Sequence, residues 1–173
     1  MSLLSNSVMT RHSQAKRETA EWINSQLSSA ASSYVSVTLT AKQAVMNADG
    51  NLISTKREDM DREVGKFLRR LDAGVYGNAS KRYSKKLRRI DASHGGADTF
   101  QRLHRHLIIE IPQRFNNDDE FKQFAELIQT AWTKSPYARE IIDVSRTDNL
   151  YASVRYLIKD GGADNLSLTN IVL

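Results

Sequence analysis

Residues 34–40 alternate apolar and polar side chains, which is the two-residue period of a β-strand with one buried face. Further strands are predicted to end at about residue 94, to span 103–111 before Pro112, and to span about 140–145. Apolar residues at helical spacing predict helices over 14–27, through 60–71, over 118–134 and from 149 to about 159. We expect Thr55 and Glu58 to form a capping box before the second helix, and Asp148 to cap the last.

The order strand, helix, strand, strand, helix, strand predicts an α+β fold with a ferredoxin-like antiparallel sheet. Its two covering helices are expected on one face, which leaves the other face open. The first helix, with an apolar stripe of Trp22, Ile23 and Leu27, is followed by a Ser/Ala-rich stretch at 28–33. This pattern suggests an N-terminal appendage and linker over 1–33, followed by one domain over 34–173.

The composition excludes several classes of protein and site. The sequence has no cysteine, so disulfide frameworks, thiolate metal sites and cysteine nucleophiles are ruled out. No apolar run approaches the roughly 18 residues of a membrane span. The N-terminal residues do not have the pattern of a secretion signal. We therefore expect a cytoplasmic protein with no membrane partner.

The net charge of +5 is unevenly distributed. Residues 1–90 carry 16 basic and 8 acidic side chains, whereas residues 91–173 carry 9 basic and 12 acidic ones. The densest basic stretch, here called the basic run, comprises Lys81, Arg82, Tyr83, Lys85, Lys86, Arg88 and Arg89. Its cations could neutralise phosphates and its tyrosine could stack on a base, which makes nucleic acid a candidate partner. The alternative is a solvated loop or hairpin.

Three of the four histidines, His94, His104 and His106, fall within thirteen residues. On a strand, His104 and His106 point to the same face, opposite the apolar Leu103, Leu107, Ile109 and Ile111. His94 ends the preceding strand of the same hairpin and can reach the same place. Three imidazoles could bind a divalent metal and leave positions for substrate oxygens. The alternative is a set of histidines that only make hydrogen bonds.

Tyr156 and Lys159 form a second candidate group on the last predicted helix. Both lie off its apolar stripe and near each other. A tyrosine can act as a nucleophile, and a neighbouring ammonium can stabilise its charge or that of an attacked phosphate. Most exposed tyrosine–lysine pairs at this spacing have no catalytic role.

Together, these segments resemble the HUH endonucleases of the rolling-circle replication initiator type. The resemblance covers about residues 34–160 and rests on three segments in order: YVSVTLT at 34–40, LHRHLIIEIP at 103–112 and YLIK at 156–159. The segment FLRRLDAGVYG at 67–77 is similar to the helix and turn before the second strand in small phage and plasmid relatives.

The resemblance implies an active site on the sheet face without helices. His104 and His106 would hold Mg²⁺ or Mn²⁺, Tyr156 would attack a phosphate of single-stranded DNA, and Lys159 would hold that phosphate or balance charge. The 5′-phosphotyrosine intermediate would leave a 3′-OH that primes rolling-circle replication of a phage or plasmid. Attack by an incoming 3′-OH would rejoin the strand.

The third metal ligand departs from the common family pattern. Relatives commonly have a glutamate near the end of the second strand, where this sequence has His94. Asp91 is the alternative third ligand. Arg105 stands between the two histidines in place of the usual bulky apolar residue, and it is expected on the opposite face.

Three functions are consistent with these features. The first is a replication initiator that nicks an origin, with single-stranded DNA or an origin hairpin as its partner. The second is a single-strand transposase or relaxase-like enzyme, and the third is a non-catalytic DNA-binding protein. The sequence has no G-x-x-x-x-G-K-[ST] loop, so a separate host helicase is expected to unwind the DNA.

Overall fold

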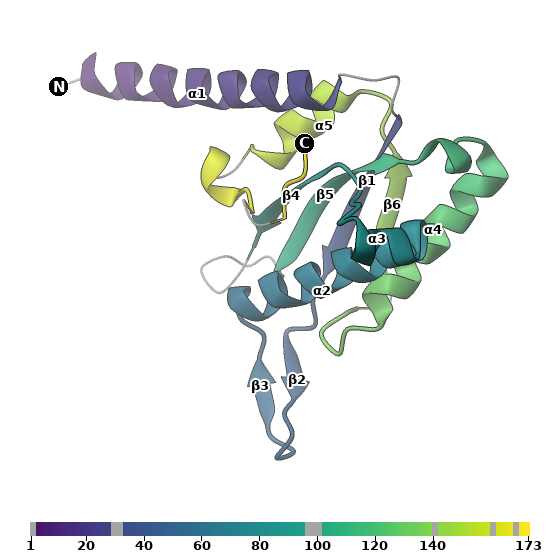
Figure 1. Ribbon diagram of the computed structural model, residues 1–173. Helices are drawn as coiled ribbons and strands as arrows, with labels where there is room; N and C mark the ends of the chain where they lie inside the picture. The colour runs from purple at the N-terminus through teal and green to yellow at the C-terminus, as the bar shows by residue number, and fades with distance from the viewer. Residues whose placement is uncertain (1–2, 29–32, 96–101, 140–141, 160–161, 168–169) are drawn as a thin grey trace.

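A four-stranded antiparallel sheet forms the centre of the protein (Figure 1). The computed structural model describes residues 3–28, 33–95, 102–139, 142–159, 162–167 and 170–173. The strands are β1 (Ser33–Thr40), β4 (Arg89–His94), β5 (His104–Ile111) and β6 (Asp143–Arg146), adjacent in the order β4-β5-β1-β6. Helix α2 (Arg57–Tyr76) lies between β1 and β4 in the chain, and α4 (Asp118–Thr133) lies between β5 and β6. This arrangement confirms the ferredoxin-like α+β fold.

Helices α2 and α4 cover one face of the sheet, as predicted. The period of two directs alternate apolar residues of β1 and β5 toward these helices. The main members of this first core are Val35, Val37, Leu39, Leu107, Ile109, Met60, Val64, Phe67, Leu68, Leu71, Phe124, Ile128 and Trp132. All are almost completely buried, so this layer supplies most of the hydrophobic stabilisation.

The opposite face is only partly open, contrary to the prediction. Helices α1 (Leu3–Leu27) and α5 (Leu150–Leu157) lie against each other and cover part of it (Figure 1). Their second core consists of Ala20, Ile23, Leu27, Tyr34, Ile90, Ala92, Ile108, Val154, Leu157 and Ile158. The apolar side chains that β4 and β5 direct to this face would otherwise be left in water, which is the physical reason for the second layer.

Helix α1 is therefore packed into the fold and is not an appendage. Ile23 and Leu27 are fully buried, whereas Trp22, which we assigned to the apolar stripe, is 55% exposed. The hydroxyl of Tyr34 donates a hydrogen bond of 2.7 Å to the carbonyl of Leu27, so β1 is joined to the end of α1. Residues 29–32, most of the predicted linker, lie outside the described residues.

A short hairpin of β2 (Ala44–Met46) and β3 (Leu52–Ser54) extends away from the sheet (Figure 1). Residues 47–51 form its turn, and neither strand was among the predicted elements. Within the turn, the side-chain oxygen of Asn47 accepts hydrogen bonds from the amides of Asp49 and Asn51. Gly50 adopts a positive φ of 79°, a backbone conformation that glycine tolerates best.

Both predicted helix caps are displaced by one residue. The amide of Thr55 donates to the carbonyl of Gln43 and closes the hairpin, so α2 is capped at Lys56, whose amide donates to Asp59. At α5, the side chain of Asn149, not Asp148, accepts the amide of Ala152.

The remaining helical segments are short. They are α3 (Asn78–Arg82), η1 (Gln113–Phe115) and η2 (Gly162–Asn165). Near the C-terminus, Leu166 and Val172 form isolated bridges with Ala92 and Arg89 of β4, respectively. Among the described residues, no helix combines the length and the apolar composition that crossing a membrane requires.

Candidate active site

The three histidines predicted as a group lie together on the sheet face that α5 partly covers. His104 and His106 are two residues apart on β5, and their ring centroids are 4.9 Å apart. The antiparallel register pairs His94 with His104 across the strands. The ring of His94 consequently lies 5.7 Å from that of His104 and 5.0 Å from that of His106.

Each imidazole makes a hydrogen bond through one ring nitrogen. Nδ1 of His104 donates to the carbonyl of Arg102 at 2.7 Å, and Nε2 of His94 donates to the carbonyl of Leu157 at 2.9 Å. Because a carbonyl can only accept, the lone pair of a neutral ring then sits on Nε2 of His104 and on Nδ1 of His94. Nδ1 of His106 is 3.0 Å from the hydroxyl of Thr38. Contacts of this kind orient the histidines that bind metals in proteins.

Tyr156 lies next to this histidine group. Helix α5 buries Val154 and Leu157 against the sheet, and the helical period leaves Tyr156 on the helix edge, 50% exposed. Its ring centroid is 5.2 Å from that of His106, at an interplanar angle of 81°. The hydrogen bond between His94 and Leu157 joins the end of the same helix to β4.

Lys159 follows the end of α5, because the helix ends two residues earlier than predicted. Its Nζ lies 3.9 Å from the centroid of the Tyr156 ring, a cation–π contact. The predicted pairing of these two residues is therefore present, although Lys159 reaches the tyrosine from the residues after the helix.

The three histidines, Tyr156 and Lys159 all line one cavity of about 410 Å³. It is lined by Thr38, Thr40, His94, Arg102, His104, His106, Tyr156 and Lys159. Sequence analysis did not assign Thr38, Thr40 or Arg102 to the site. The polar face of β1 was an available signal, because Thr38 and Thr40 are the register partners of His106 and His104.

A second cavity, of about 420 Å³, adjoins the first at His106 and Tyr156, which line both. Most of its other lining residues are of polar type and come from β1, β6, the residues before α5 and the start of α5. They are Ser36, Ser145, Arg146, Thr147, Asp148, Asn149 and Ser153. The tyrosine therefore stands where two cavities meet.

The donor chemistry of the histidine group fits a divalent ion, because neutral imidazoles are common metal ligands. In the described parts of the chain, however, no three His, Asp or Glu side chains already have the arrangement of a metal site. A site that uses all three histidines would therefore require the rings to move. His94 is least able to do so, because it is buried and bonded to Leu157.

Asp91, the alternative third ligand, lies on the opposite face of the sheet, so that prediction is wrong. It is fully buried, and Nε of Arg105 donates to it at 2.8 Å. Arg105 also forms an ion pair with Asp61 of α2, and the side chain of Asn170 donates to Asp91 at 2.8 Å. Burial disfavours the guanidinium charge, but the hydrogen bonds and charges of the two aspartates outweigh it and raise the pKa of Arg105.

The basic run does not line either cavity around Tyr156. The run ends at Arg89, the first residue of β4, whereas His94 is the last, so about 17 Å of strand separates them at 3.3 Å per residue. Its exposed members are Lys81, Arg82, Tyr83, Lys85 and Lys86.

Two members of the basic run are engaged inside the fold. Arg89 is 4% exposed and donates twice to Asp72, at 2.7 and 2.9 Å, so its predicted role in binding DNA is wrong. Arg88 is half-buried, and its guanidinium donates to the carbonyl of Gln26.

Comparisons with models of protein families, with curated proteins and with solved structures found no match.

Proposed function

We propose that the protein nicks and rejoins single-stranded DNA by the chemistry of HUH endonucleases, with Tyr156 as the nucleophile. The observation that carries the proposal is the position of Tyr156. Its ring is 5.2 Å from His106, and it shares a cavity with three histidines and Lys159. A nucleophile, a cation and candidate metal ligands are the groups that phosphoryl transfer requires.

In the proposed reaction, the phenol oxygen of Tyr156 attacks a phosphorus atom of the DNA strand. A bond forms between that oxygen and phosphorus, and the bond from phosphorus to the 3′-oxygen breaks. The tyrosine loses its proton, and the departing 3′-oxygen gains one to become a 3′-OH. The strand on the other side remains attached to Tyr156 through its 5′-phosphate, and attack by a 3′-OH reverses the steps.

The residues around the tyrosine have separate roles in this proposal. The ammonium of Lys159, placed over the tyrosine ring, would stabilise negative charge on the phosphoryl oxygens. His104 and His106 would hold a Mg²⁺ or Mn²⁺ ion, with His94 as the third ligand or as the group that positions them. A bound ion would polarise the attacked phosphate. Thr38 orients His106 through its hydroxyl.

The two cavities that meet at Tyr156 favour an extended strand as the substrate. One strand can occupy both, with the attacked phosphate at the junction and DNA on either side. Initiation of rolling-circle replication of a phage or plasmid, with a separate host helicase, is the biological role that we propose. Single-strand transposition or a relaxase-like role would use the same chemistry on another substrate.

The test is a search for a covalent adduct with a pool of random-sequence single strands, because the recognised sequence is unknown. The protein is incubated with Mn²⁺ and strands labelled at either the 3′ or the 5′ end, and is then denatured on a gel. We expect the 3′ label, but not the 5′ label, to migrate with the protein. Retention of the 5′ label alone would contradict a 5′-phosphotyrosine.

Two variants make the test specific. Tyr156→Phe should bind DNA but form no adduct, whereas Tyr83→Phe, which changes a more exposed tyrosine in the basic run, should react normally. An adduct that persists in Tyr156→Phe would rule out this nucleophile. Binding without an adduct in the unmodified protein would favour the non-catalytic DNA-binding function.

A further inference from the structure

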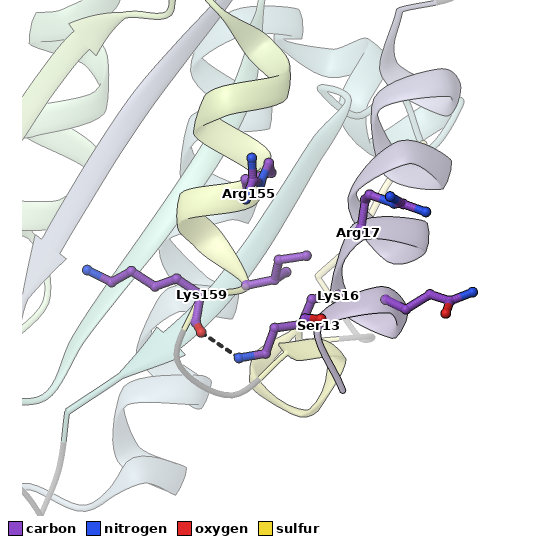
Figure 2. A pocket seen from close by; sticks show the side chains of 7 residues that line it. Ser13, Lys16, Arg17, Arg155 and Lys159 are labelled. Carbon is purple, nitrogen blue, oxygen red and sulfur yellow. Dashed lines mark hydrogen bonds between the residues drawn. The ribbon is translucent and has the colours of Figure 1, made fainter. Parts of the chain in front are cut away.

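A basic cavity of about 600 Å³ lies between helices α1 and α5 (Figure 2). Its charged lining consists of Lys16 and Arg17 from α1, Arg155 from α5, and Lys159 just after α5. Among the described residues, no carboxylate lines it. Sequence analysis assigned no role to Lys16, Arg17 or Arg155, which belong to segments far apart in the chain.

Among the described residues, carboxylates compensate few of the positive charges of this cavity. Arg17 has an ion pair with Glu21, but the pair is exposed and 3.6 Å long, so it is weak. Lys16 donates to the backbone carbonyl of Lys159 at 2.6 Å, a contact that leaves its charge in place. Within the described ranges, Lys16, Arg155 and Lys159 have no carboxylate partner at ion-pair distance. Like charges gathered in this way create a positive potential that attracts anions.

The basic cavity is joined to the candidate active site through Lys159, which lines both. Figure 2 shows the carbonyl of Lys159 bonded to Lys16, while its side chain extends toward the opposite side of α5. That side chain ends over the ring of Tyr156. Arg155 lines the same cavity as Lys159, Lys16 and Arg17, so a group of cations extends from Lys159, beside Tyr156, to α1.

We propose that this basic cavity binds the phosphodiester backbone of the DNA strand beside the phosphate that Tyr156 attacks. The inference rests on the proposed function and assigns α1 a part in holding the substrate. A polymer fits better than a small anion, because the cations come from two helices and surround a space of about 600 Å³. The basic run, at the far end of β4, cannot supply this contact.

The experiment compares two double variants of equal charge change. Arg17→Gln with Arg155→Gln removes two cations of the basic cavity. The control variant, Lys122→Gln with Lys134→Gln, removes one exposed cation on α4 and one just after it. It is matched because Lys122, like Arg17, has an exposed acidic partner on its own helix. Binding of an oligothymidylate is measured by fluorescence anisotropy at several salt concentrations, in chelator so that no cleavage occurs.

Each phosphate contact on a single strand contributes about 0.7 to the slope of log affinity against log salt concentration. The Arg17 and Arg155 variant should therefore lose about 1.4 from the magnitude of the slope, and the control variant should keep it. Equal slopes in the unmodified protein and the Arg17 and Arg155 variant would overturn the proposal. Calorimetry with inorganic phosphate should show no binding, and tight binding of phosphate with unchanged slopes would identify a small-anion site instead.

Failure of this inference is distinguishable from failure of the proposed function. A covalent adduct in the unmodified protein, together with equal salt slopes, would reject only the basic cavity as a DNA contact. A reduced slope without any adduct would support the DNA contact and reject the nuclease.

Discussion

Replacement of Arg105 tests whether the stability of β5, the strand that carries His104 and His106, depends on the ion pairs on the face opposite these histidines. Arg105 stands between His104 and His106 but points toward α2, where its guanidinium meets Asp91 and Asp61. Arg105→Met retains most of the length of the side chain and removes the charge. Asp91 would then remain fully buried without a cation, although Asn170 would still donate to it.

The expected cost follows from the burial of the pair. The side chains of Arg105 and Asp91 are 2% and 0% exposed, so little solvent is present to compensate the remaining carboxylate. Removal of one partner from a buried ion pair costs about 3–5 kcal/mol. Arg62→Met is the matched control, because Arg62 pairs with Asp59 while 52% exposed, and exposed pairs contribute about 0–1 kcal/mol.

Urea denaturation followed by circular dichroism measures the difference. With an m-value of about 2 kcal/mol/M, Arg105→Met should lower the midpoint by about 1.5–2.5 M. Arg62→Met should lower it by less than about 0.5 M. Equal midpoint shifts in the two variants would refute the argument that the buried network stabilises β5.

Four further outcomes are expected. Leu27→Ala should destabilise the protein by about 2–5 kcal/mol because Leu27 is fully buried, whereas Trp22→Ala should cost far less; equal denaturation midpoints would mean that α1 is not packed as described. Burial disfavours the Glu63 carboxylate, but hydrogen bonds from a lysine and a serine hold its pKa below the usual value. The ionised Glu63 therefore stabilises the fold fully above the pKa of the unfolded state, and this stabilisation is lost as the pH falls through the pKa of the folded state. In thermal melts, the loss of stability caused by Glu63→Gln should become smaller below about pH 4.3 and should not change above it. Adduct formation should be faster with Mn²⁺ than with Mg²⁺ at equal concentration, because imidazole nitrogen suits Mg²⁺ poorly, and faster reaction with Mg²⁺ would argue against ligation by histidines alone. Lys85→Gln with Lys86→Gln should leave the adduct rate at saturating DNA unchanged, since the basic run is far from Tyr156, and a slower rate would place that run at the site.

Local periodicity was sufficient to predict much of the candidate site. Two residues separated by one position share a strand face, so His104 and His106 had to lie together once β5 formed. The same rule places Asp91 and His94, three positions apart, on opposite faces, and it could have excluded Asp91 as a ligand. The distance from the basic run to His94 likewise follows from the length of β4.

Other features depended on contacts between distant parts of the chain. The register of β4 on β5 brings His94 opposite His104, and the packing of α5 brings Tyr156 to His106. A helical pattern shows which side chains share a face, but it does not identify the surface against which that face will pack. For the same reason, the burial of Arg89 against Asp72 was not visible in a run of basic residues.

The sequence by itself determined the order of the elements, the two-faced strands and the residue types available for chemistry. These properties depend on the backbone period and on side chains close in the chain. Only the tertiary structure decided that α1 and α5 cover the second face, because their apolar residues find partners on β4 and β5. That packing places Tyr156 beside the histidines and creates the basic cavity from cations on both helices.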